Sequence, residues 1–212
     1  SQRKFINLLL KNKWTKHGKE GKKVKIMKTP LCKLAFKYGS DKCPEIGHSY
    51  TPFYYELLKG KDFKKVLELG IGSKEVMKDV PEHYQTGASL RMWRDFFPNA
   101  QVYGVDIHPS CMFKDERIET FLLNTRKKHD LERLIFKIGS DIDLVIDDGP
   151  HRTGAQLAAA RKLLSLLDKK VIYVVEDVIN PNIFRHKIPY ECEVHRFTHE
   201  RTNQNNLVII KK

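Results

Sequence analysis

The stretch KKVLELGIGS, residues 64–73, decides the fold. Its apolar core, residues 66–69, is typical of a short buried strand, and the strand ends in glycines at positions 70 and 72. Glycines after a strand allow a tight turn and bring backbone amides close to a ligand. A lone GxG is a weak signal, because ordinary strand–helix turns share it. The stretch therefore predicts a buried strand whose carboxyl end carries a candidate ligand loop.

The same strand-and-helix pattern repeats along the chain. Further strands are predicted over residues 100–109, 117–123, 143–149 and 171–177. Helical spacing of apolar residues predicts helices over 52–58, 88–98, 129–138 and 155–167. The end of the chain reads as a hairpin around a polar turn at 203–206. We predict a Rossmann-like α/β fold: a seven-stranded, mostly parallel sheet with a C-terminal antiparallel hairpin and helices on both faces.

The positive charge is concentrated at one end of the chain. The net charge is +13 over 212 residues, but residues 1–28 contain ten Lys or Arg and one acid. The body is nearly balanced, so nucleic acid is an unlikely partner on this evidence. We predict a basic N-terminal segment or linker over residues 1–30 and one domain over 31–212. No apolar stretch approaches the roughly 20 residues that cross a bilayer.

The cysteines favour neither a zinc site nor a disulfide framework. Four cysteines are widely spaced, and the sequence contains no CxxC pair and no Cys/His cluster. Reduced thiols in a cytoplasmic compartment are therefore expected, the host cytoplasm if the protein is viral.

Polar residues follow the predicted strands where ligands bind in parallel sheets, beyond the carboxyl ends. They are Glu68, Asp106, Asn124, Thr125, Asp147, Asp148, His151, Glu176 and Asp177. A carboxylate at Asp106 suits the two hydroxyls of a ribose. The phosphate-binding patterns GxGxxG and GxxxxGK[ST] are absent, so a nucleoside ligand without phosphates fits better than a dinucleotide or ATP.

The stretches DLVIDDGPH (143–151) and VVED (174–177) place carboxylates at two neighbouring strand ends. Adjacent strands lie about 4.8 Å apart, so these like charges repel unless a cation separates them. Oxygen ligands favour a hard cation such as Mg²⁺ over zinc. A DDG sequence alone is also common in turns and helix caps, and a lone histidine is more often structural. We predict His151 as a general base, because an imidazole titrates in the useful range.

VLELGIGS followed by YGVDIHP resembles the first two motifs of class I S-adenosylmethionine-dependent methyltransferases. Four more stretches are similar to the macrocin-type sugar O-methyltransferase family: YGSDKCPEIGHSYTPFYYELL, GASLRMWRDFFPNAQVYGVDI, DLVIDDGPH and VVED. The likeness runs from about residue 37 to the C-terminus. It implies a metal-dependent O-methyltransferase that acts on a sugar hydroxyl, with a 6-deoxyhexose such as rhamnose as the expected acceptor.

The resemblance also implies site residues. Asp148, Glu176 and Asp177 match the divalent metal triad, with Asp148 and His151 as catalytic groups. Glu68, Gly70 and Gly72 would line the methionine and ribose, and Asp106 and Ile107 the ribose and adenine. The family usually has an acidic residue at the position of Asn124. The side-chain oxygen of Asn124 could still accept a hydrogen bond from the adenine amino group. The remaining implied cofactor contacts are Lys42, Tyr50, Ser73, Ser89, Trp93, Thr125 and Asp147, and Tyr38, Asp41 and His48 match the same N-terminal motif as Lys42 and Tyr50.

Two other functions remain open from the sequence. The basic N-terminus is compatible with an RNA or cap ribose 2′-O-methyltransferase. A non-catalytic cofactor-binding module that docks partners through residues 1–30 is the other alternative. The missing initial Met and the lysine-rich start lead us to expect an excised C-terminal domain of a larger, viral glycan-building enzyme.

Overall fold

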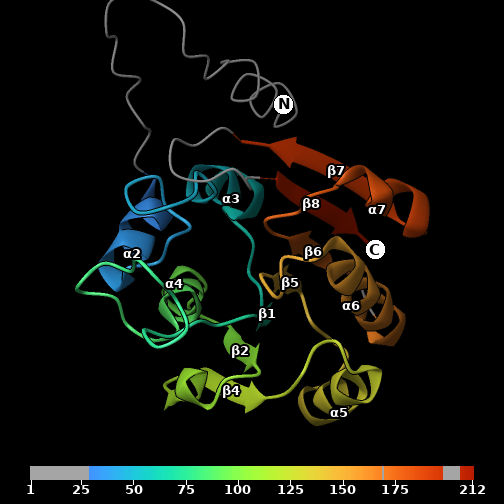
Figure 1. Ribbon diagram of the computed structural model, residues 1–212, viewed down its shortest axis with the longest axis horizontal. Helices are drawn as coiled ribbons and strands as arrows, with labels where there is room; N and C mark the ends of the chain where they lie inside the picture. Colours follow the sequence, from blue (N-terminus) through green and yellow to red (C-terminus); the bar gives the residue numbers. More distant parts are fainter. Residues whose placement is uncertain (1–28, 169, 198–205) are drawn as a thin grey trace, which may run out of the picture.

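The computed structural model describes residues 29–168, 170–197 and 206–212 (Figure 1). The predicted basic segment therefore lies outside the described residues, except for its last two positions. The predicted hairpin turn at 203–206 also lies outside them, except for Asn206. No helix in the described ranges combines the length and apolar character needed to cross a membrane.

The chain forms one mixed sheet in the order β3-β4-β2-β1-β5-β6-β8-β7. The five strands from β4 to β6 are parallel, and β8 and β7 form the predicted antiparallel hairpin. The predicted fold class is confirmed. An eighth strand, β3, was not predicted because two residues show no periodicity. The bounds are β1 Lys65–Leu69, β2 Gln101–Asp106, β3 Lys114–Asp115, β4 Ile118–Leu122, β5 Leu144–Asp147, β6 Ile172–Val175, β7 Glu191–Arg196 and β8 Asn206–Lys211.

Helices cover both faces of the sheet (Figure 1). One face carries α2 Pro30–Tyr38, α3 Thr51–Leu58 and α4 Ala88–Phe96. The other carries α5 Lys128–Ile138, α6 Thr153–Leu166 and α7 Asn182–Lys187, and a 3-10 turn, η1 Pro109–Cys111, follows β2. Side chains alternate along each strand, so Val66 packs into the core under α4 and Leu67 into the core under α6. Helix α2, which was not predicted, begins where the Oγ1 atom of Thr29 accepts a hydrogen bond from the Cys32 amide at 3.2 Å.

The central strands end at one level. In the register of the sheet, Leu69 lies beside Asp147, and Asp147 lies beside Val175. Backbone bonds continue this register by one residue, from the Asp148 amide to Leu69 and from the Glu176 amide to Asp147. The strand order changes direction between β1 and β5, which is where parallel sheets open a crevice for ligands. Residues after these strands are therefore brought to one edge.

Candidate active site

A cavity of about 520 Å³ opens at this edge, above the carboxyl ends of β1, β2 and β5. Its volume lies within the range of small-molecule sites. Most of the residues predicted from the sequence line it: Lys42, Gly70, Gly72, Ser89, Asp106, Ile107, Asn124, Thr125, Asp148, His151 and Asp177. The cavity is therefore the candidate active site.

The loop after β1 approaches the loop after β5 so closely that Gly70 has no room for a side chain. A Cβ atom on Gly70 would lie 2.1 Å from the backbone oxygen of Asp148, and its φ of +87° is one that other residues rarely adopt. The loop reaches the cavity floor only because position 70 is glycine.

Asp106, at the end of β2, holds the same loop in place. Its Oδ2 atom accepts hydrogen bonds from the amides of Ile71 and Gly72 at 2.9 and 3.3 Å, and its Oδ1 atom accepts one from His108. An ionised carboxylate has about four acceptor positions, so Asp106 keeps capacity for a ligand. The next side chain, Ile107, is 53% exposed and lines the cavity, where it offers an apolar surface.

Asn124 also lines the cavity, but its side-chain oxygen already has a partner. The Oδ1 atom accepts a hydrogen bond from the Arg126 amide at 3.0 Å. A carbonyl oxygen has a second lone pair, so a bond to an adenine amino group would have to be shared with Arg126.

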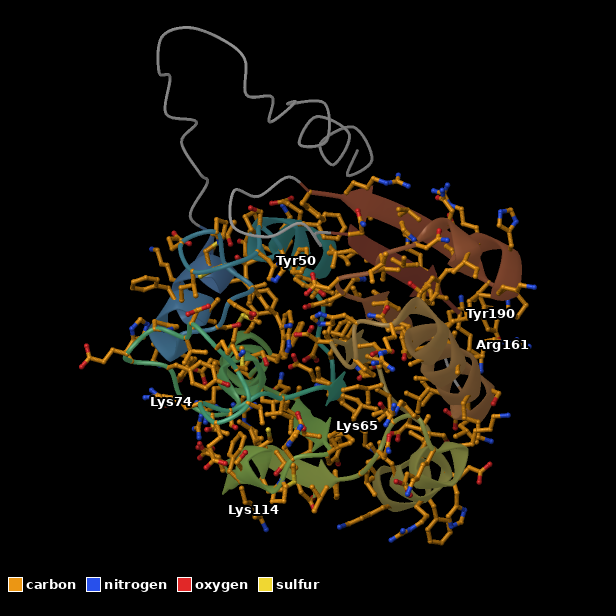
Figure 2. All side chains as sticks on the ribbon, in the orientation of Figure 1. Tyr50, Lys65, Lys74, Lys114, Arg161 and Tyr190 are labelled. Atoms are coloured by element: carbon orange, nitrogen blue, oxygen red, sulfur yellow. The ribbon has the colours of Figure 1, made fainter. Side chains whose placement is uncertain are left out.

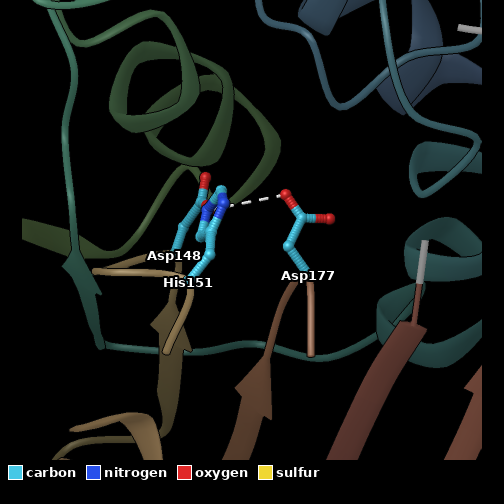
Figure 3. Close-up of side chains that lie close together, drawn as sticks. All are labelled: Asp148, His151 and Asp177. Atoms are coloured by element: carbon cyan, nitrogen blue, oxygen red, sulfur yellow. Dashed lines mark hydrogen bonds and ion pairs between the residues drawn. The ribbon is translucent and has the colours of Figure 1, made fainter. Parts of the chain in front are cut away.

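The other end of the cavity holds an acid–histidine cluster (Figure 3). One ligand atom each of Asp148, His151 and Asp177 lie within 4.8 Å of one another. His151 Nε2 is 3.4 Å from Asp148 Oδ1 and 3.6 Å from Asp177 Oδ2. The remaining oxygens are anchored, since Asp148 Oδ2 accepts from Lys42 Nζ at 2.6 Å and Asp177 Oδ1 accepts from the Tyr50 hydroxyl at 2.5 Å. Each carboxylate thus has one oxygen held and one turned toward His151.

Charge sets the protonation of this cluster. Burial would raise the pKa of Asp148, but the positive charges of Lys42 and His151 lower this pKa well below its ordinary value. The hydrogen bond to Asp148 raises the pKa of His151, against a smaller opposing effect of burial. Burial, and then the charge of Asp148, raise the pKa of Asp177. Opposite charges hold the cluster together. A further positive charge near Asp177 would stabilise the ionised form of its carboxyl group.

The structure brings two of the three predicted metal ligands, Asp148 and Asp177, together with His151. Glu176 does not line the cavity and shares the Lys42 ammonium with Asp148. Its Oε2 atom accepts from Lys42 Nζ at 2.5 Å and its Oε1 atom from the Tyr54 hydroxyl at 2.6 Å. Asp177 joins Asp148 because its left-handed φ of +53° turns the chain out of the extended conformation after β6.

Lys42 is the centre of the buried charge. Its Nζ atom also lies 3.4 Å from Oε1 of Glu68, and the lysine side chain is 1% exposed. Burial would lower the pKa of Lys42, but Asp148, Glu176 and Glu68 together raise it well above its ordinary value. Burial raises the pKa of Glu68 to about 7.

Five predicted cofactor contacts do not line the cavity. Tyr50 anchors Asp177 instead. Trp93 donates to Oε2 of Glu68 at 3.0 Å, so both are buried behind the wall. The remaining two form internal bonds: Ser73 with Ser110, and Asp147 with the Tyr173 hydroxyl at 2.9 Å. Asp147 follows the strand alternation to the opposite face, so its contact is with the core rather than with the cavity.

Sequence reasoning missed two groups that shape the site. Tyr54 was assigned only to an apolar helix face, and its hydroxyl bond to Glu176 shows no sequence signal. Gln156 in α6 donates to the backbone oxygen of Glu176 at 2.8 Å, which fixes the loop after β6. A polar residue in the apolar run AQLAAA was the available hint.

Comparison with known proteins gives relatives of one kind. No protein-family model matches the chain. Over 151 residues it is 34% identical to the 8-demethyl-8-(2-methoxy-alpha-L-rhamnosyl)-tetracenomycin-C 3′-O-methyltransferase of Streptomyces olivaceus, a match that covers 70% of this chain and 36% of that protein. Over 174 residues it is 31% identical to the mycinamicin VI 2″-O-methyltransferase of Micromonospora griseorubida, covering 78% of this chain and 41% of that one.

A solved structure of a methyltransferase is also similar to this chain. The MycE methyltransferase of the mycinamycin biosynthetic pathway, determined in complex with Mg and SAH, superimposes with a TM-score of 0.58 and 30% identity, over 71% of this chain and 37% of that one. The chain thus spans little more than a third of the length of the relatives it matches. The chain is therefore similar to sugar O-methyltransferases of the tetracenomycin, mycinamicin and macrocin type and shares the fold of the MycE methyltransferase over the matched span.

Proposed function

We propose that this chain moves a methyl group from S-adenosylmethionine to a hydroxyl of a sugar in a glycan or glycoside, with a 6-deoxyhexose such as rhamnose as acceptor. One observation carries the proposal: a single cavity joins a nucleoside-type loop at Asp106 and Ile107 to the cluster of Asp148, His151 and Asp177. The acceptor class is supported by the relatives, whose names specify rhamnosyl and macrolide-linked sugars.

The cavity fits S-adenosylmethionine through its own residues. Asp106 keeps about one acceptor position for a ribose hydroxyl, and Ile107 gives an apolar face for adenine. S-adenosylmethionine, when bound, supplies an electrophilic methyl group.

The cluster fits a divalent cation such as Mg²⁺. Asp148 Oδ1 and Asp177 Oδ2 are hard oxygen donors on one side of the cavity, and no cysteine lines it. Asp148 and Asp177 would hold the cation, with Glu176 as a third ligand still a prediction. A divalent cation, when bound, lowers the pKa of a hydroxyl that contacts it.

His151 carries the proton chemistry in this proposal. His151 lines the cavity and its imidazole is 43% exposed, so an acceptor hydroxyl can reach the ring. The hydroxyl gives its proton to the imidazole, and the negative charge of Asp148 stabilises the imidazolium that forms. Tyr50 and Lys42 keep the two carboxylates in place, so the oxygen nucleophile is fixed in angle as well as activated.

Two further parts of the proposal concern the rest of the chain. We assign residues 1–30 to a linker or basic segment before the catalytic domain, as the charge distribution indicates. The cytoplasm is the proposed compartment, because the four cysteines are widely spaced and the sequence contains no CxxC pair.

A methyl-transfer screen of defined rhamnosides and other glycosides tests the proposal. The 212-residue chain is incubated with methyl-labelled S-adenosylmethionine, in Mg²⁺ and in EDTA, and capped RNA serves as the competing acceptor. We expect transfer to a sugar that is lost in EDTA and in Asp148→Asn, and no transfer to RNA. Absence of cofactor binding by calorimetry, or transfer to RNA alone, would overturn the proposal.

A further inference from the structure

Lys42 is a fully buried lysine at the junction of the two halves of the cavity. It comes from the segment between α2 and α3, and so reaches the sheet edge from outside the sheet. Its Nζ atom is 2.5 Å from Glu176, 2.6 Å from Asp148 and 3.4 Å from Glu68, and its side chain is 1% exposed. One ammonium therefore contacts the ends of three neighbouring strands.

The ammonium stands where a carboxylate cluster needs positive charge. Burying an unpaired carboxylate is very costly, and Glu68 and Glu176 are both essentially inaccessible. The ammonium of Lys42 is the positive partner of Glu176, and it is also one of the two positive partners of Asp148, together with His151. A cation at the neighbouring cluster would contact the same Asp148 from its other oxygen.

Two cations that share one carboxylate repel each other. The effect is strong at short range beside a buried ammonium, because the effective dielectric there is below that of water. The Lys42 charge therefore opposes the approach of a divalent ion, while its hydrogen bond keeps Asp148 oriented toward that ion. A substitution that removes the charge and keeps a hydrogen-bond donor, such as Lys42→Gln, separates these two effects.

We propose that Lys42 is a positioning residue that acts as an internal cation: it holds Asp148 and Glu176 when no divalent cation is bound, and it limits how tightly one binds. The inference rests on the proposed function only in taking the cluster of Asp148, His151 and Asp177 as the cation site. A moderate affinity keeps the ion exchangeable while the acid cluster stays folded without it.

The test is Mn²⁺ binding by calorimetry, with Lys42→Met in the full chain compared with wild type. We expect Lys42→Met to bind Mn²⁺ at least about tenfold more tightly than wild type. In EDTA the variant should unfold at a lower temperature, and added Mn²⁺ should raise its unfolding temperature more than it raises that of wild type. Lys65→Met is the matched control, because Lys65 pairs with Asp141 at the opposite end of β1 (Figure 2).

The Mn²⁺ affinities of the variants and of wild type distinguish the inference from the proposed function. Equal or weaker Mn²⁺ binding by Lys42→Met, with Lys65→Met unchanged, overturns the inference and leaves the proposed function standing. Binding by Lys42→Met where wild type shows none supports the inference and counts against a metal-dependent wild-type enzyme. No binding by either protein overturns both.

A folding defect does not block the test. Lys42→Gln is the second variant, because an amide keeps a donor for Asp148 while the charge is lost. If both variants are unfolded in EDTA, recovery of circular dichroism on addition of Mn²⁺ supports the internal-cation role. Failure of both variants to recover in Mn²⁺ overturns it.

Discussion

The Tyr50 hydroxyl donates a hydrogen bond of 2.5 Å to Oδ1 of Asp177, and this leaves Oδ2 as the oxygen that faces the cavity. Asp177 also has a φ of +53°, a left-handed conformation that few residues adopt without support. Tyr50 thus fixes a strained turn as well as a carboxylate.

Replacement of Tyr50 by Phe should therefore weaken both the fold and the cation site. A hydrogen bond to a charged acceptor contributes about 1.5–3 kcal/mol to stability. The free energy of unfolding in urea should therefore fall by about that amount in the variant. Mn²⁺ affinity should fall several-fold because Oδ2 is no longer held in place. Tyr190→Phe, at the outer surface near Arg161 (Figure 2), is the control that should change neither quantity.

His151→Gln should separate the general base from the cation ligands. We expect methyl transfer to fall by about 10²–10⁴, the usual contribution of proton transfer. Mn²⁺ affinity should fall less in this variant than in Asp148→Asn, because a carboxylate is the preferred donor to a hard cation. An equal loss of affinity in both variants would make His151 a ligand instead of a base.

The pKa of His151 should respond to Asp148. In EDTA, NMR titration of the wild-type imidazole should give a pKa above its ordinary value, since Asp148 stabilises the charged ring. Asp148→Asn should lower this pKa. The pair of His151 and Asp148 stabilises the folded state fully below the ordinary pKa of histidine. This stabilisation is lost as the pH rises through the raised pKa of His151. A wild-type pKa at or below that of the variant would contradict the assignment.

Gly70→Ala should be far more damaging than Gly60→Ala. Both glycines have positive φ, +87° and +75°, so both substitutions carry the left-handed penalty of about 1–2 kcal/mol. Nothing lies near a Cβ on Gly60, whereas a Cβ on Gly70 would overlap the Asp148 backbone. Chemical denaturation and calorimetry with S-adenosylhomocysteine should show the greater destabilisation and the loss of cofactor binding only at position 70.

The sequence was a good guide to the sheet because its signals are local. Apolar runs that stop at a carboxylate predicted the strand ends at Asp106 and Asp148, and parallel register then placed them at one edge. The short elements β3, η1 and α7 were missed, because two to six residues are too few for a periodic pattern.

Side-chain direction at the site could not be predicted in the same way. Lys42 lies 106 residues from Asp148 and 134 from Glu176 along the chain, so their contact exists only in three dimensions. Trp93 and Asp147 were assigned to the cofactor from the family resemblance, and in the structure each forms a hydrogen bond with a buried partner, Glu68 and Tyr173 respectively. Tertiary pairing, rather than strand or helix propensity, decided these cases.

The segment between α2 and α3 contributes to two parts of the site. It places Ser40, Asp41 and His48 on the cavity wall, while the acid cluster and the glycine loop come from the sheet. The same segment carries Lys42, whose Nζ atom contacts Asp148 and Glu176 at the sheet edge. Changes at Ser40 would therefore alter the cavity wall, whereas changes at Lys42 would also disturb the carboxylates of the sheet edge.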